Sequence, residues 1–152
     1  MDIKKKRRFH VSRTSWGAQA ERKVQRILEG LPMDHFIVMN DVRFKYGNID
    51  HLVVRDDGTV FLVETKSHRG RVTTDGQQLL LNGRPFKKNY LCQINRNIRW
   101  LRSMAKKVFG LNRWYVAIIV FPNAHVFGKT SAKRVNTVAA DRLISFIRSY
   151  SR

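Results

Sequence analysis

The sequence predicts an α/β fold in a single domain. Segments in which apolar residues recur at helical spacing alternate with short runs rich in branched and aromatic residues, which are typical of strands. Of the 152 residues, 43% are hydrophobic and 11% are aromatic, which is enough apolar material for one folded core. The order of the segments predicts a helix, three strands, a small hairpin, a second helix, a strand, and then a last strand and helix.

The first half of the chain supplies the first helix and the three strands. From about Ala18, apolar residues recur at helical spacing until Gly30 and Pro32 close the pattern. The strand-like runs that follow are residues 36–42, 49–54 and 60–66. Asp57-Gly58 is a turn signal between the last two runs, so we expect a hairpin or meander.

The second half begins with another hairpin and continues with a long helix. Asn82-Gly83 predicts the tight turn of this hairpin. Helical periodicity then runs over residues 88–108, and residues 115–121 form an apolar run that predicts a buried strand. A last short strand is expected at 135–138, before a terminal helix capped by Asp141.

The charge of the chain is extreme. There are 30 Lys and Arg against 11 Asp and Glu, which gives a formal net charge of +19. Such a charge predicts strong attraction to polyanions, with nucleic acid first and an anionic membrane surface second. Residues 1–13 are the most basic segment and are predicted to form a flexible N-terminal arm, followed by a single domain over residues 14–152.

Several classes of protein are excluded. The longest apolar run, residues 115–121, is far shorter than the ~20 residues of a membrane-spanning helix, and the basic start lacks the apolar stretch of a secretory signal. The single cysteine, Cys92, excludes a disulfide framework and a paired-cysteine zinc site. We expect Cys92 to be a buried thiol and the protein to be cytoplasmic. The phosphate-binding, nucleophile-elbow and dinucleotide motifs are absent, which excludes hydrolases of those classes.

Three acidic residues fall where burial is costly unless a partner or a metal ion holds them. Asp50 shares one face of its strand with the apolar side chains that follow it, and Glu64 shares a face with Lys66. Glu21 lies at the edge of the buried stripe of the first helix. If the two strands are neighbours, these four side chains can converge. His51 points to the face opposite Asp50, and we expect it to be a packed, hydrogen-bonded histidine.

This set of residues suits a divalent metal ion. Oxygen ligands bind Mg²⁺ through one or two carboxylates, and Mn²⁺ is expected to substitute. Lys66 is placed to orient a water or to stabilise negative charge that develops on a phosphate. The residues alone leave an alternative open, in which Glu64 and Lys66 form an ion pair at a sheet edge and Asp50 is a turn residue after Gly47-Asn48.

Two sequence blocks carry a resemblance to a known family. They are Gly47-Asn48-Ile49-Asp50-His51-Leu52-Val53-Val54 and Val60-Phe61-Leu62-Val63-Glu64-Thr65-Lys66, the latter followed by Gly70-Arg71-Val72. Gly17-Ala18-Gln19-Ala20-Glu21, Asn89 with Gln93, and Phe121-Pro122-Asn123-Ala124 extend the match, whereas Tyr90 and residues 67–69 depart from it. Over residues 17–126 the chain resembles the nuclease-related domain (NERD) family, a branch of the PD-(D/E)XK restriction-endonuclease-like superfamily.

The resemblance implies a restriction-endonuclease-like αβββαβ core, with a mixed central sheet flanked by helices. It also implies metal-dependent cleavage of phosphodiester bonds in DNA. The catalytic roles then fall on Glu21, Asp50, Glu64, Lys66 and Gln93, with Asp50 and Glu64 as the metal ligands.

Basic residues near these positions are the predicted DNA contacts, because Lys and Arg bind phosphates. On the long helix they lie away from the buried stripe, and a solvated face is the alternative interpretation there. The predicted set is Lys4, Lys5, Lys6, Arg7, Arg8, Arg69, Arg71, Lys87, Lys88, Arg96 and Arg99.

The sequence therefore predicts a DNA nuclease that depends on Mg²⁺ or Mn²⁺. A rival hypothesis is a DNA-binding accessory module of the same fold with weak or no catalysis, and a third is a basic protein held on RNA or on an anionic membrane. The acidic residues favour the enzyme, because a pure binder would gain affinity by losing buried acids that repel phosphate. The sequence leaves the oligomeric state open, a homodimer included.

Overall fold

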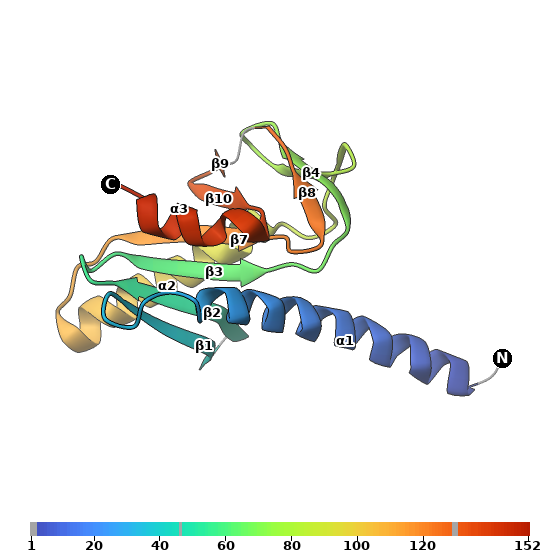
Figure 1. The fold of residues 1–152 in the computed structure, drawn as a ribbon, viewed down its shortest axis with the longest axis horizontal. Coiled ribbons are helices and arrows are strands. Elements are labelled where there is room, and N and C mark those ends of the chain that lie inside the picture. The colour runs from blue at the N-terminus through green and yellow to red at the C-terminus, as the bar shows by residue number, and fades with distance from the viewer. Residues whose placement is uncertain (1–2, 46, 129–130) are drawn as a thin grey trace.

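The computed structural model describes residues 3–45, 47–128 and 131–152, with side chains from Trp16 onward except at residue 109. Its fold is α/β, as predicted (Figure 1). The elements in chain order are α1 (Ile3–Leu28), β1 (Phe36–Phe44), β2 (Gly47–Arg55), β3 (Val60–Thr65), β4 (Gly70–Thr74), β5 (Leu79–Leu81), β6 (Arg84–Pro85), α2 (Tyr90–Phe109), β7 (Tyr115–Val120), β8 (Ala124–Val126), β9 (Ser131–Ala132), β10 (Val135–Val138), the 3₁₀ turn η1 (Ala140–Arg142) and α3 (Leu143–Ser149).

The main sheet is mixed, with strand order β1-β2-β3-β7-β10-β9. The first three strands form the expected antiparallel meander, whereas β7 lies parallel to β3 and β10 lies parallel to β7. A parallel neighbour requires a crossover connection, and the crossover from β3 to β7 contains α2. The order α1, β1, β2, β3, α2, β7 is the αβββαβ order that the family resemblance implied.

The central strands of the main sheet, β3 and β7, are buried on both faces, because each face packs against helices. Figure 1 shows α1 and α3 in front of the sheet and α2 behind it. Alternating residues of the central strands therefore enter two separate apolar clusters, and nearly every residue of β3 is buried. One cluster includes Val24, Leu28, Phe61, Ile118 and Leu143. The other includes Leu52, Leu62, Ile94, Ile98 and Ile119.

A second, smaller sheet has strand order β6-β5-β4-β8. The sequence predicted only its β5–β6 hairpin. Gly70 opens β4 with a φ of 121°, and a Cβ there would lie 2.7 Å from Oδ1 of Asn82. The close approach has a function in the fold, since the Arg71 backbone N–H donates to that same oxygen at 2.9 Å. Glycine at this position therefore lets the hairpin pack directly against the chain that leaves β3.

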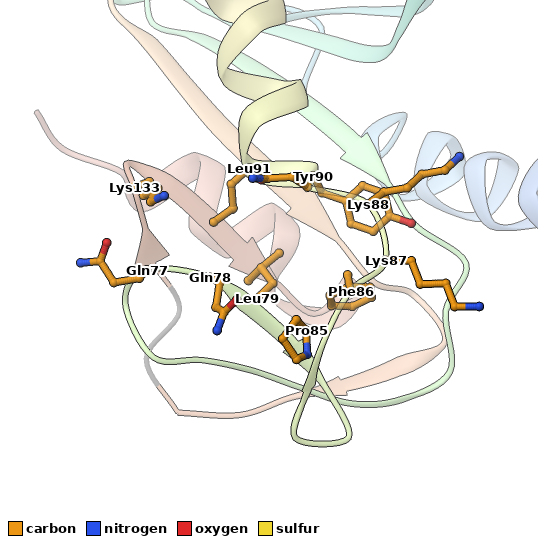
Figure 2. A pocket seen from close by; sticks show the side chains of 11 residues that line it. Gln77, Gln78, Leu79, Pro85, Phe86, Lys87, Lys88, Tyr90, Leu91 and Lys133 are labelled. Carbon is orange, nitrogen blue, oxygen red and sulfur yellow. The ribbon is translucent and has the colours of Figure 1, made fainter.

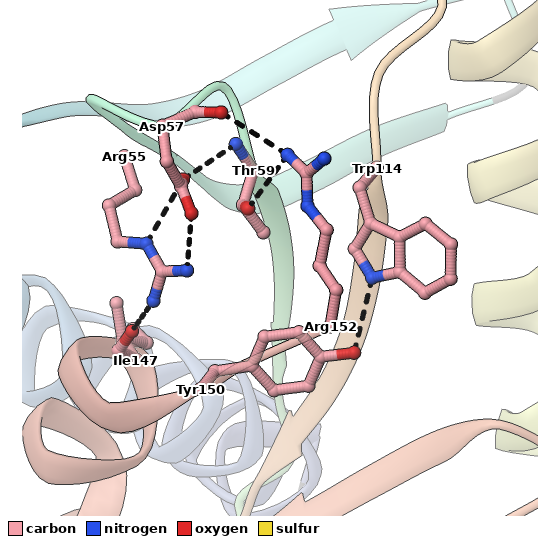
Figure 3. Close-up of polar contacts among 7 residues, drawn as sticks. All are labelled: Arg55, Asp57, Thr59, Trp114, Ile147, Tyr150 and Arg152. Atoms are coloured by element: carbon pink, nitrogen blue, oxygen red, sulfur yellow. Dashed lines mark hydrogen bonds and ion pairs between the residues drawn. The ribbon is translucent and has the colours of Figure 1, made fainter.

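A polar network ties the turn between β2 and β3 to the C-terminal segment (Figure 3). The Arg55 guanidinium donates to both carboxylate oxygens of Asp57, at 2.6 and 3.1 Å, and to the backbone carbonyl of Ile147 at 2.8 Å. Arg152 donates to the Asp57 carbonyl at 3.2 Å, and the Trp114 indole N–H donates to the Tyr150 hydroxyl at 3.1 Å. These contacts hold α3 against the sheet.

The structure differs from the sequence prediction in three local features. Helix α1 begins at Ile3 rather than near Ala18, because Lys and Arg are good helix formers even where no apolar face repeats. Asp141 lies inside η1, and α3 has no side-chain cap, so the predicted cap is wrong. Cys92 is exposed, because it follows Leu91 and lies off the buried stripe of α2. In the described ranges, no helix is long and apolar enough to span a membrane.

Candidate active site

Asp50 and Glu64 lie side by side on neighbouring antiparallel strands. His51 of β2 pairs with Val63 of β3, which puts Asp50 and Glu64 together at the end of the ladder. Both residues are buried, since Asp50 is 9% exposed and Glu64 is 4% exposed. The Thr65 backbone N–H donates to Oδ2 of Asp50 at 2.8 Å, and this bond joins the two strand ends. The structure thus brings together the two predicted metal ligands.

The electrostatics of this pair are unfavourable without a third partner. Burial, repulsion from the Asp50 carboxylate and a hydrogen bond with Asp50 raise the pKa of Glu64 to about 8, although the Lys66 charge opposes the shift. Oε1 of Glu64 is buried and has no hydrogen-bond partner among the side chains and backbone that the structure describes. A buried oxygen without a partner costs free energy, so a group that bound it would stabilise the site.

Glu21 reaches the same site from α1. Partial burial and the charges of Asp50 and Asp41 raise its pKa, while the Lys66 charge lowers it. Asp41 is a further acidic residue beside the site. It lies on β1 between the residues that pair with His51 and Ile49, which places it beside Asp50 on the next strand. Only the strand register reveals this acidic neighbour.

Lys66 follows β3 directly and is half-buried. Its backbone N–H donates to the Val120 carbonyl at 2.9 Å, so the main chain stays fixed where β3 ends. Its ammonium lies over the ring of Tyr90, 4.4 Å from the centroid. Lys66 therefore sits between the acidic residues and the first turn of α2.

An aromatic cluster lies behind Lys66, and sequence reasoning did not predict it. Nε2 of His68 and the hydroxyl of Tyr90 share a hydrogen bond of 2.8 Å. Burial and the nearby Lys66 charge lower the pKa of His68, and burial raises the pKa of Tyr90. The rings of Phe86 and Phe121 complete the cluster. Its members come from four separate segments, so no local pattern could reveal it.

The residues present fit a hard divalent cation. Asp50 and Glu64 offer carboxylate oxygens, one of which is buried without a hydrogen-bond partner. Among the residues that the structure describes, no group of three or more His, Cys, Asp or Glu could hold a metal ion. Mg²⁺ needs only one or two protein carboxylates and fills its other positions with waters and phosphate oxygens.

His51 and Gln93 were also singled out from the sequence, and their surroundings differ from those of the acidic pair. His51 is 2% exposed, and its ring nitrogens share hydrogen bonds with Asn40 at 2.7 Å and with Thr65 at 3.5 Å, which confirms a packed histidine. Gln93 is half-buried in the first turn of α2, which Asn89 caps by accepting from the Cys92 N–H at 3.0 Å. Within the described ranges, the Gln93 side chain has no hydrogen bond with the four residues of the acidic site.

The predicted DNA contacts whose side chains are described are all exposed, and they are Arg69, Arg71, Lys87, Lys88, Arg96 and Arg99. Lys87 and Lys88 line a groove of about 320 Å³ between the β5–β6 hairpin and the start of α2, with Tyr90 in its wall (Figure 2). A groove lined by lysines therefore adjoins Tyr90, whose ring contacts the Lys66 ammonium. The side chains of Lys4, Lys5, Lys6, Arg7 and Arg8 lie outside the described residues.

Two buried acids and a lysine at the ends of paired strands, in an αβββαβ domain, define a restriction-endonuclease-like protein. The model of the nuclease-related domain family matches residues 16–122, and the chain belongs to that family. No curated protein sequence matches the chain. Among solved structures, a repair endonuclease from Pyrococcus abyssi is similar with 18% identity and a TM-score of 0.36, over 80% of this chain and 37% of that one. The chain thus spans little more than a third of that protein.

Proposed function

We propose that the protein is a divalent-metal-dependent deoxyribonuclease that hydrolyses phosphodiester bonds at the site formed by Asp50, Glu64 and Lys66. The observation that carries the proposal is the buried acid pair, in which Oε1 of Glu64, beside Asp50, has no hydrogen-bond partner within the described part of the chain. A fold gains nothing from two adjacent buried carboxylates unless something binds them. Membership of the nuclease-related domain family supports the same reaction class.

The roles of the residues follow from their chemistry. Asp50 and Glu64 would hold Mg²⁺ or Mn²⁺, and the chemistry that the ion supplies when bound is activation of a water and neutralisation of phosphate charge. Lys66 donates hydrogen bonds to the attacking water or to the phosphate oxygens as negative charge develops on them. Glu21 orients water at the mouth of the site. Gln93 is proposed to contact the substrate near the start of α2.

The substrate is proposed to be DNA because the chain carries a net charge of +19. The exposed Lys and Arg side chains around the site would contact phosphates, and binding of this kind tolerates any sequence. The chain's single cysteine favours a reducing compartment, so we place the activity in the cytoplasm.

The test is a cleavage assay on supercoiled, linear, single-stranded and branched DNA with Mg²⁺, Mn²⁺ or EDTA. Wild type should cut at least one form only when a divalent ion is present. Asp50→Asn should lose cleavage by orders of magnitude while DNA binding, measured in EDTA or Ca²⁺, stays level or tightens. Glu29→Gln is the matched control, because it removes one carboxylate from an exposed position directly after α1.

The rival hypothesis has its own outcome in this assay. If wild type cuts none of the four forms with either ion, and Asp50→Asn binds DNA as wild type does, the protein is a DNA-binding module that has kept the fold without the chemistry.

A further inference from the structure

The lysine of the site lies against an aromatic face. The 4.4 Å between Nζ of Lys66 and the centroid of the Tyr90 ring is well inside the ~6 Å range of a cation–π interaction. Tyr90 is the first residue of α2, and Lys66 follows β3. The contact therefore joins the end of β3, which carries Glu64, to the first residue of α2.

Among the described residues, no carboxylate holds the Lys66 ammonium directly. In the described part of the chain, none of the ion pairs includes Lys66. Its charge still acts on Glu64 and Glu21 at longer range. A lysine side chain is a flexible four-carbon stem that loses considerable rotamer freedom when it is held in one place. The ring of Tyr90 contacts the Lys66 ammonium and can hold it in one position.

The Tyr90 ring is itself held from several sides. Its hydroxyl shares the 2.8 Å hydrogen bond with His68. The His68 ring packs edge-on against Phe86 at 5.0 Å, and Phe86 stacks on Phe121 at 5.7 Å. These residues come from the segment after β3, the end of the β5–β6 hairpin and the end of β7, so three parts of the fold fix one ring.

We propose that Tyr90 is a positioning residue for the nuclease reaction: its ring holds the Lys66 ammonium beside the acidic pair, and His68 fixes the ring. The inference rests on the proposed function, because Tyr90 acts on the rate only through Lys66. Without the ring, Lys66 is free to leave the site, so turnover falls while substrate affinity, which comes from the many Lys and Arg contacts, is kept.

The kinetic test compares Tyr90→Leu with Tyr90→Phe. Tyr90→Leu should lower kcat by about 2- to 30-fold with little change in KM, the range that a cation–π contact corresponds to. Tyr90→Phe keeps the ring and should retain most of the rate. Tyr115→Leu is the matched control, because it removes a half-buried tyrosine that lies 5.5 Å from the Arg102 guanidinium, outside the acidic site.

A double-mutant cycle separates positioning from general damage to the fold. In a Lys66→Ala background, Tyr90→Leu should have no further effect on kcat, because the group that it positions is gone. An equal decrease in both backgrounds would overturn the inference while leaving the proposed function standing. A wild type that cuts no DNA would instead refute the proposed function, and the inference with it.

A spectroscopic readout tests the contact in the wild-type protein itself. The Lys66 ε-methylene protons should be shifted upfield by the Tyr90 ring in the NMR spectrum of the wild type, with Lys66→Ala used to assign them. Tyr90→Phe should keep this shift, and His68→Phe should reduce it by freeing the ring. Ordinary lysine shifts in the wild type would overturn the inference.

Discussion

Replacing Glu64 with Gln should stabilise the metal-free protein. The substitution keeps the shape of a side chain that is 4% exposed, and it removes an ionisable carboxyl beside Asp50. The new amide can also donate a hydrogen bond to the Asp50 carboxylate. Holding a buried carboxyl in its protonated form above its ordinary pKa costs stability, and a glutamine needs no proton, so we expect Glu64→Gln to unfold at a higher temperature than wild type in EDTA.

The size of the effect follows from the protonation of Glu64. Its pKa is raised from 4.5 in the unfolded chain to about 8 in the fold. Stability is therefore lost as the pH rises above 4.5, by about 1.36 kcal/mol for each pH unit, until the folded protein ionises as well. At pH 7 Glu64→Gln should therefore be more stable than wild type by an amount on the order of 2–3 kcal/mol, once the cost of burying the amide is subtracted. For a chain of this length that corresponds to roughly 5–10 °C in Tm.

Thermal unfolding of wild type and Glu64→Gln in EDTA, at pH 5 and at pH 7.5, measures this difference in stability. The advantage of Glu64→Gln should be small at pH 5 and large at pH 7.5, and Glu29→Gln should show no such change. Mn²⁺ should then raise the Tm of wild type but not that of Glu64→Gln, because an ion that binds only the folded state stabilises it. A variant that is no more stable than wild type at pH 7.5 would refute the reasoning.

Other predictions concern the turn network, the basic segment and the second sheet. Asp57→Asn should lower stability by about 1 kcal/mol at pH 7, since water screens a pair whose carboxylate side chain is 43% exposed. Arg55 lowers the pKa of Asp57 in the folded protein. The difference in stability between wild type and Asp57→Asn should therefore shrink as the pH falls from 3.8 toward that lowered pKa, and a difference that does not change with pH would contradict the pairing. Replacing Lys4, Lys5 and Lys6 with Gln should flatten the salt dependence of DNA binding by up to about 0.9 for each phosphate that the variant no longer neutralises, whereas an unchanged slope would show that these lysines do not bind phosphates. Gly70→Ala should cost about 1–3 kcal/mol in a denaturant titration, because its φ is positive and Asn82 occupies the space of the new Cβ; a neutral variant would show that the hairpin can move.

Much of the site could be predicted from the sequence because its central residues lie on consecutive strands. The period of two determines which face Asp50 and Glu64 share, and a short turn makes their strands antiparallel neighbours. Glu21 could be placed because helical periodicity relates it to the buried stripe of α1.

The rest depends on contacts between distant segments. The second sheet requires parallel pairing of Gly70 with Ala124, and the polar strand around Gly70 has no apolar alternation to reveal it. The contact of Lys66 with Tyr90 joins a strand end to a helix start, and no local pattern relates those positions. The start of α1 was missed because the prediction required an apolar face, whereas the backbone of residues 3–15 is helical without a repeating one.

The central claim is that Asp50 and Glu64 hold one divalent ion between them. Anomalous diffraction from crystals soaked in Mn²⁺ tests it most directly. The account predicts a single strong peak within bonding distance of both carboxylates, with Glu21 close enough to reach it through a water. A peak elsewhere, or none at this site with both carboxylates accessible, would contradict the account.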